Sequence, residues 1–157
     1  MAGRGGFEIE TVLEVGRSPR EVFDYLADTA SFKALDLALV EFEPDGRMTA
    51  GMTGRFLHRR GGLPARSTWS VEELDPPRRL LVEIAGMGYG MTESADLEAT
   101  DGGTRIRFVD RVWPTTLPGR LMVALSGGIM RRDLRARADR LRSILESGVL
   151  PPRSSSR

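Results

Sequence analysis

Two hydrophobic periodicities follow each other along the chain, and their order restricts the possible fold more than any other feature of the sequence. Apart from one short helical interruption, apolar residues recur at every second position as far as residue 113, in segments separated by turns rich in glycine, proline and aspartate. After the segment PTTLPG, residues 114–119, the repeat changes to about 3.6 residues, which is typical of a helix. Strands joined by such short connections pair in the antiparallel direction. The sequence therefore predicts an antiparallel sheet followed by one long helix.

The first predicted strand covers residues 7–15 and is followed at once by a helix start signal. Ser18 is the predicted N-cap, Pro19 the first helical residue and Glu21 the partner that completes a capping box. A second short helix is predicted over the segment TASFKAL, with its first residue, Thr29, as the cap. Six further strands are predicted over residues 37–44, 52–60, 65–74, 79–86, 89–99 and 104–113.

The final helix is predicted to pack one apolar stripe against the sheet and to bend or break at the pair Gly127 and Gly128. A sheet of seven strands that curls around one helix leaves space unfilled, because a helix is only about 10 to 12 Å across. We therefore expect an internal cavity. The stripe consists of Met130, Leu134, Ala138, Leu141 and Leu145.

Composition excludes several classes of function. The chain has no cysteine, so disulfides, thiolate metal sites and thiol nucleophiles are absent. A single histidine and scattered carboxylates predict no metal and no other cofactor. The 23 basic residues nearly balance the 22 acidic ones, so we expect no nucleic-acid partner. Without an apolar run long enough to span a bilayer or a secretory leader, we expect a cytoplasmic protein with no stable membrane insertion.

Four polar residues fall on otherwise apolar faces of the predicted strands: Thr11, His58, Glu93 and Asp110. His58 suits proton transfer near neutral pH, and the alternative is a partly solvated histidine at a strand end. Glu93 and Asp110 lie on neighbouring strands, where burial and mutual repulsion raise the pKa of at least one carboxyl if both face the cavity. The alternatives are a bulge near Gly90 that turns Glu93 outward, or ion pairs to Arg105, Arg107 or Arg111.

Two sets of candidate site residues follow from these patterns. His58, Glu93 and Asp110 are the candidate catalytic residues. The candidate ligand-binding residues are Thr11, Phe56, Trp69, Tyr89, Met91, Phe108, Leu121 and Leu125.

Four segments together resemble a known superfamily. They are SPREVFDYLADTASF after the first strand, VEELDPPRRLLVEI in the middle, DGGTRIRFVDRV near the end and RLRSILE in the last helix. Their order and spacing are similar to those of the START/Bet v 1-like superfamily, which includes the SRPBCC polyketide cyclase/dehydrase proteins. Many relatives have a tryptophan shortly after the first helix, where this chain has Phe32.

The resemblance implies an α+β helix-grip fold, in which a curved seven-stranded antiparallel sheet wraps around the C-terminal helix and encloses a hydrophobic tunnel. The sequence also predicts one domain over residues 7–148, with a flexible N-terminus at 1–6 and a disordered tail at 149–157.

Three functions remain open on these grounds. The first is binding of a hydrophobic or aromatic small molecule, lipid- or polyketide-like, without a cofactor. The second is an aromatase/cyclase or dehydrase that acts on a polyketide-type substrate by acid–base catalysis. The third is an interaction module similar to chaperone cofactors or quinone-binding relatives. We expect a monomer or a homodimer.

Overall fold

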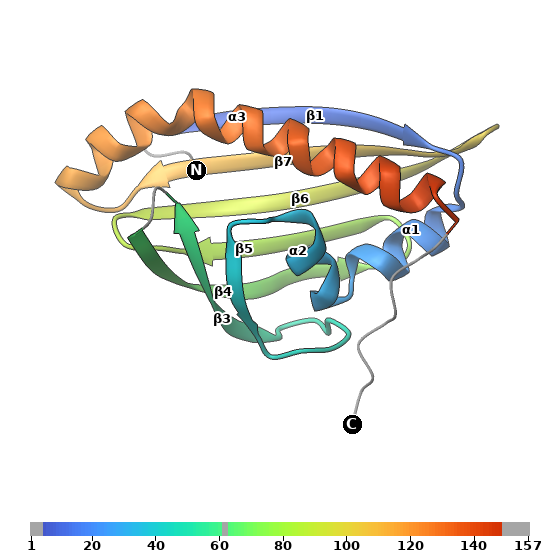
Figure 1. Ribbon diagram of the computed structural model, residues 1–157, viewed down its shortest axis with the longest axis horizontal. Helices are drawn as coiled ribbons and strands as arrows, with labels where there is room; N and C mark the ends of the chain where they lie inside the picture. The colour runs from blue at the N-terminus through green and yellow to red at the C-terminus, as the bar shows by residue number, and fades with distance from the viewer. Residues whose placement is uncertain (1–4, 61–62, 149–157) are drawn as a thin grey trace.

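Seven strands form one antiparallel sheet in the order β1-β7-β6-β5-β4-β3-β2. The computed structural model describes residues 5–60 and 63–148 (Figure 1). Sequential neighbours pair throughout, except that β1 pairs with β7. The elements are β1 (Phe7–Val15), α1 (Pro19–Leu26), α2 (Thr29–Leu35), β2 (Leu39–Glu43), β3 (Thr53–Arg60), β4 (Leu63–Asp75), β5 (Arg79–Ala85), β6 (Tyr89–Thr100), β7 (Gly103–Pro114) and α3 (Leu117–Glu146).

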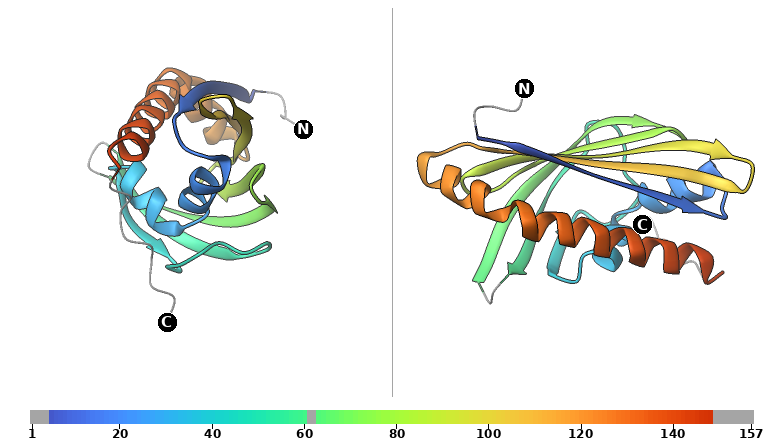
Figure 2. Two further views of the ribbon diagram at one scale, coloured as in Figure 1. Left: turned by 90° about the vertical axis from the view of Figure 1, so that its right-hand side faces the viewer. Right: turned by 90° about the horizontal axis from the view of Figure 1, so that it is seen from above.

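The sheet curves around α3, while α1 and α2 lie beneath the helix at one side of the curve (Figure 2). Helix α3 packs mainly on β1 and β7, and α2 packs on β2. The core lies between these layers and includes Phe23, Met48, Ile106 and Leu141, all nearly inaccessible to solvent. The predicted α+β helix-grip architecture is therefore confirmed.

The start of α1 follows its sequence signal. Ser18 accepts a hydrogen bond from the Glu21 backbone N–H, and the Glu21 carboxylate accepts one from the Ser18 N–H, as in the predicted capping box. The predicted cap of α2 is wrong by one residue. Asp28 is the N-cap and accepts from the Ala30 N–H, while the Thr29 hydroxyl accepts from the Gly46 N–H at 2.8 Å. The Thr29 hydroxyl thus binds α2 to the turn after β2.

Helix α3 runs without a break from Leu117 to Glu146, so the predicted break at Gly127 and Gly128 does not occur. A side chain at Gly127 would only make ordinary contact with the Phe7 ring, and Gly128 faces open space. Packing on β1 compensates for the weak helix propensity of the two glycines, about 1 kcal/mol each. The predicted stripe is otherwise confirmed, since Met130 is half-buried and its other members are buried: Leu134, Ala138, Leu141 and Leu145.

Over residues 5–60 and 63–148, no helix has the length and hydropathy needed to cross a bilayer. The predicted flexible N-terminus and disordered tail fall largely outside the described residues, at 1–4 and 149–157.

Candidate ligand-binding cavity

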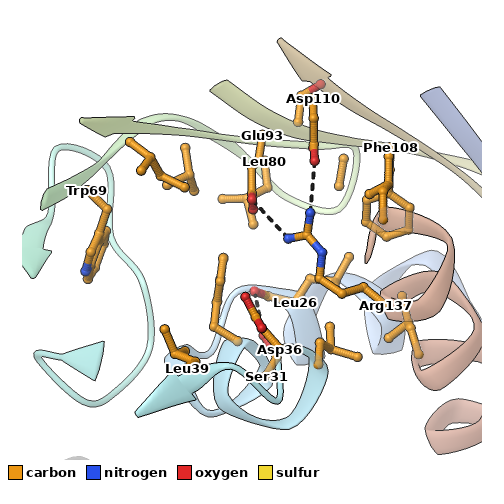
Figure 3. Close-up of a pocket in the computed structure, with 18 of the residues that line it drawn as sticks. Leu26, Ser31, Asp36, Leu39, Trp69, Leu80, Glu93, Phe108, Asp110 and Arg137 are labelled. Atoms are coloured by element: carbon orange, nitrogen blue, oxygen red, sulfur yellow. Dashed lines mark hydrogen bonds and ion pairs between the residues drawn. The ribbon is translucent and has the colours of Figure 1, made fainter. Parts of the chain in front are cut away.

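A cavity of about 110 Å³ lies between the inner face of the sheet, α1, α2 and the second half of α3 (Figure 3). Most of its lining is apolar and comes from elements far apart in the sequence. The apolar residues of the lining include Leu26, Leu80, Val82, Ile84, Ala95, Leu134, Ala138 and Leu141.

Aromatic rings close one side of this cavity. The Phe42 ring stacks on Phe32 at a centroid distance of 5.1 Å, on Trp69 at 4.9 Å and on Phe56 at 6.0 Å. The indole N–H of Trp69 donates to the Glu43 carbonyl, so only the apolar part of the ring is offered to the cavity. This wall suits a flat apolar ligand.

The cavity volume sets a limit on what can be enclosed as the side chains stand. Cavities that hold benzene measure about 150 Å³, and sites for drug-sized ligands about 300 to 1,000 Å³. Even a one-ring ligand therefore requires some displacement of the cavity wall, and a larger ligand requires displacement of the wall formed by α2 and β2. The half-buried side chains of this wall are Phe32, Leu35 and Leu39.

Three charged side chains meet at the wall opposite the aromatic rings (Figure 3). Arg137 of α3 donates from Nη1 to Glu93 Oε1 and from Nη2 to Asp110 Oδ2, both at 2.9 Å. Glu93 and Asp110 face each other directly across β6 and β7. The side chains are 21%, 18% and 3% exposed in the order Arg137, Glu93 and Asp110. We call these three residues the inner cluster.

The environment of Asp110 changes its acidity. Burial, reinforced by the neighbouring charge of Glu93, raises the pKa of Asp110 to about 7, against the opposing effect of Arg137. Burial lowers the pKa of Arg137, but the two carboxylates more than offset this and keep it above its ordinary value. Arg137 is therefore always charged, while Asp110 changes its protonation state near neutral pH.

The alternative partners expected for the two carboxylates are not the ones observed. Arg105, Arg107 and Arg111 form ion pairs with glutamates of β1 on the other face of the sheet. The register between β6 and β7 runs without a shift from Tyr89 to Thr100, so no bulge turns Glu93 outward. Both carboxylates consequently point into the cavity.

Five of the eleven candidate site residues line the cavity: Phe56, Trp69, Glu93, Phe108 and Asp110. Four others lie on the strands without reaching it. The His58 ring lies 5.6 Å from that of Phe56, the Tyr89 hydroxyl is 3.4 Å from Ser67 Oγ, Met91 is in the core, and Thr11 of β1 is paired with Phe108.

Leu121 and Leu125 lie on the outside of α3 and are 66% and 72% exposed. Their predicted role as lining residues therefore does not agree with their position. The first half of α3 is apolar on both faces, so its sequence does not indicate which face is turned to the sheet.

Sequence reasoning missed Arg137, although a signal for it was present. Arg137 follows Leu134 by three residues and precedes Leu141 by four, so it lies on the apolar stripe of the helix. A charged residue on an apolar face is the same kind of exception that identified Glu93 and Asp110. Ser31 and Asp36, which also line the cavity, have no such signal.

Among the described residues, no group of three or more histidine or carboxylate side chains is arranged to hold a metal ion.

The comparison with protein families is decisive for the classification of this chain. Residues 6–146 match the family model described as "Polyketide cyclase / dehydrase and lipid transport". The chain belongs to this family. Membership in the polyketide cyclase/dehydrase and lipid transport family supports binding of a hydrophobic ligand in general. No curated protein matches the chain.

Solved structures show the same fold at low sequence identity. A protein from Thermus thermophilus is 17% identical with a TM-score of 0.71, over 92% of this chain and 99% of its own. A protein from Rhodobacter sphaeroides is 20% identical with a TM-score of 0.68, over 95% and 99%. The Bet v 1-type allergen Ara h 8.0201 is 16% identical with a TM-score of 0.68, over 92% and 100%.

Proposed function

We propose that the protein binds one hydrophobic or aromatic small molecule in the cavity between the sheet and α3. The observation that carries this proposal is a mainly apolar cavity with stacked aromatic rings on one side and the inner cluster on the other. Binding sites for small molecules combine an apolar lining with a few polar groups that fix orientation. The ligand is lipid- or polyketide-like in the sense that it presents an apolar body and one polar group.

The inner cluster determines which polar group fits. Arg137 already donates to both carboxylates, and Asp110 donates when protonated and accepts when ionised. Because Asp110 titrates near neutral pH, a neutral group such as a hydroxyl or a carbonyl finds a partner in either state. An anionic head group would face two carboxylates and is not expected.

A volume-filling variant tests the proposal. Ala138 lines the cavity, and Ala124 lies exposed on the same helix, so Ala138→Leu and Ala124→Leu make the same change inside and outside the cavity. Leucine is a good helix former at both positions. We expect native mass spectrometry to detect a co-purifying small molecule in wild type and Ala124→Leu and not in Ala138→Leu.

The same variants are titrated with phenol, a one-ring probe that carries a hydroxyl. We expect Ala138→Leu to weaken phenol binding at least tenfold and Ala124→Leu to leave it within twofold of wild type. The proposal is contradicted if Ala138→Leu binds phenol as wild type does, or if wild type neither carries a small molecule nor binds phenol.

The inner cluster also favours a second candidate function, an aromatase/cyclase or dehydrase without a cofactor. A carboxyl that changes protonation state near neutral pH, buried beside a second carboxylate, is suited to proton transfer. Asp110 would act as the proton acceptor and donor at the substrate. Glu93 would assist it by holding Arg137, which donates hydrogen bonds to both carboxylates. His58 does not line the cavity, and we assign it no step.

This second function is tested by following the conversion of a linear poly-β-keto thioester into cyclised or dehydrated products. General acid–base groups contribute about 10² to 10⁴ in rate, so Asp110→Asn should lower kcat at least a hundredfold. Glu10→Gln, a change on the outer face of the sheet, should leave kcat unchanged. Wild-type rates in both Asp110→Asn and Glu93→Gln would exclude acid–base catalysis by the inner cluster.

A further inference from the structure

The first half of α3 presents an apolar face to solvent as well as one to the sheet. Val123 is buried against the sheet, whereas residues at a spacing of four run along the opposite side. A surface helix of a globular protein normally has one apolar stripe, and contiguous exposed apolar surface marks an interaction site. We call the exposed residues the outer stripe: Leu117 (75% exposed), Leu121 (66%), Met122 (43%), Leu125 (72%) and Ile129 (61%).

A second element extends the outer stripe at its N-terminal end. Met87 lies in the turn between β5 and β6 and is 89% exposed. This turn is fixed to the start of α3, because the Thr115 N–H donates to the Gly88 carbonyl at 2.9 Å. A Cβ on Gly119 would fall 1.9 Å from the same carbonyl oxygen, so only glycine permits this approach. Figure 1 shows the start of β6 and the start of α3 at the same end of the molecule.

Over residues 112–132, the stretch that contains the α3 part of the outer stripe, all charges have one sign, and the acidic Asp133 follows it directly. The sequence contains no acidic residue between Arg111 and Arg132. Arg120, Arg131 and Arg132 are exposed, and none of them takes part in the ion pairs found among the described side chains. Exposed leucines beside exposed arginines suit a partner surface with a negatively charged outer layer and an apolar interior directly beneath it.

This charge pattern separates two possible occupants of the outer stripe. A second copy of the chain, packed stripe against stripe, would bring arginines of one copy close to arginines of the other, with no carboxylate in the stretch to neutralise them. An anionic bilayer accepts the leucines among its acyl chains and the arginines among its head groups. The surface of a bilayer is therefore the better match.

We propose that the outer stripe, together with Met87, docks the protein reversibly on lipid bilayers that contain anionic lipids. The helix lies on the bilayer surface and does not cross it. The opposite face of α3 continues into the cavity wall through Leu134 and Arg137, so docking places the cavity beside the bilayer. This inference goes beyond ligand binding and does not depend on what occupies the cavity.

Vesicle co-sedimentation tests the docking with the full-length protein. Vesicles of phosphatidylcholine with 30% phosphatidylserine are compared with vesicles of phosphatidylcholine alone, at low and at physiological salt. We expect wild type to bind the anionic vesicles at least tenfold more strongly than the neutral ones, and less strongly as salt rises. Equal binding to both kinds of vesicle, or to neither, overturns the proposal.

Matched variants locate the docking surface. Leu121→Gln/Leu125→Gln should weaken binding to anionic vesicles at least tenfold, whereas Val12→Gln/Leu37→Gln, which removes two exposed apolar residues elsewhere, should stay within twofold of wild type. Arg131→Gln/Arg132→Gln should weaken binding at least fivefold and reduce its salt dependence. Its control is Arg55→Gln/Arg78→Gln, which removes the same charge from other exposed positions.

Circular dichroism and sedimentation velocity accompany the binding measurements. All four double variants replace exposed residues, so we expect wild-type unfolding curves from each. If wild type is a dimer that Leu121→Gln/Leu125→Gln converts to a monomer, and no variant changes vesicle binding, the occupant is a second copy and docking on bilayers is wrong.

Discussion

The sheet carries arginine–carboxylate ion pairs on both of its faces. The two sets use the same chemical groups but differ in their exposure to solvent and in how the carboxylates are arranged around each arginine. On the outer face, Arg105, Arg107 and Arg111 of β7 reach Glu14, Glu10 and Glu8 of β1 at 2.6 to 2.8 Å. We call these three pairs the outer ladder. Its side chains are between 42% and 62% exposed. On the inner face, one arginine shares two carboxylates inside an apolar cavity.

Exposure to solvent determines how strongly the charges in each set of ion pairs interact. Water and salt screen the outer ladder, and exposed pairs of this kind contribute little to stability. The inner cluster is screened far less, because its side chains are largely buried. Burial of Asp110, reinforced by the second carboxylate that one arginine does not fully balance, is why Asp110 retains a proton at pH values where an exposed aspartate has lost it. The same residue types therefore give a surface on one face and a titrating site on the other.

Loss of the inner arginine should have the largest effect. Arg137→Met keeps a side chain of similar length but leaves two carboxylates in an apolar cavity without a cation. Removing one partner of a buried pair costs about 3 to 5 kcal/mol, and we expect a loss of that size in the free energy of unfolding, measured with urea at pH 8. The loss should shrink at pH 5, where a proton can replace the missing charge.

The matched control on the outer face is Arg107→Met, which should change the unfolding midpoint very little. If the two variants were equally stable at pH 8, the inner cluster would not be electrostatically isolated from solvent. That result would also remove the physical basis for the raised pKa of Asp110.

The dependence of stability on pH should have opposite signs for the two faces. The pKa of Asp110 is about 7 in the folded protein and 3.8 when exposed, so the folded state holds its proton more tightly. The contribution of Asp110 to stability is then fully present below pH 3.8 and is lost as the pH rises to about 7. The shift corresponds to at most about 4 kcal/mol, at about 1.4 kcal/mol per pH unit.

Asp110→Asn isolates this contribution, because asparagine keeps the shape and cannot ionise. We expect urea unfolding between pH 5 and pH 8 to show a smaller loss of stability with rising pH in Asp110→Asn than in wild type. Identical pH profiles for the two proteins would mean that Asp110 is already ionised across this range. The sign predicted for the inner carboxyl would then be wrong.

Part of the inner cluster could be predicted from the sequence. Alternation along β6 and β7 puts Glu93 and Asp110 on the apolar face. The turn at Asp101 and Gly102 then fixes the register, because pairing Thr100 with Gly103 also pairs Glu93 with Asp110. Both carboxylates and their proximity thus follow from local rules.

The position of Arg137, the third member of the inner cluster, depends on how α3 packs on the sheet, which local sequence rules do not determine. Helical spacing places Arg137 on the buried stripe, but which strand it meets depends on how α3 slides and rotates over the sheet. The same limit applies to Leu121 and Leu125. Because this segment of the helix is apolar on both faces, its sequence does not indicate how the helix is rotated about its axis relative to the sheet. The cavity volume, set by the packing of side chains from several elements, is equally beyond a sequence pattern.

The smallest predicted effect belongs to the outer ladder and has the opposite sign. A hydrogen bond from Arg107 lowers the pKa of Glu10 below its ordinary value of 4.5. The stability that this pair contributes is therefore present above pH 4.5 and is lost as the pH falls further. Glu10→Gln should flatten the acid limb of the stability profile slightly, below pH 4.5, and leave the profile between pH 5 and pH 8 unchanged. Because the pair is exposed, 1 M salt should abolish the difference between Glu10→Gln and wild type, while it should leave most of the effect of Arg137→Met in place. Equal salt sensitivity of the two variants would show that the two faces of the sheet are screened alike.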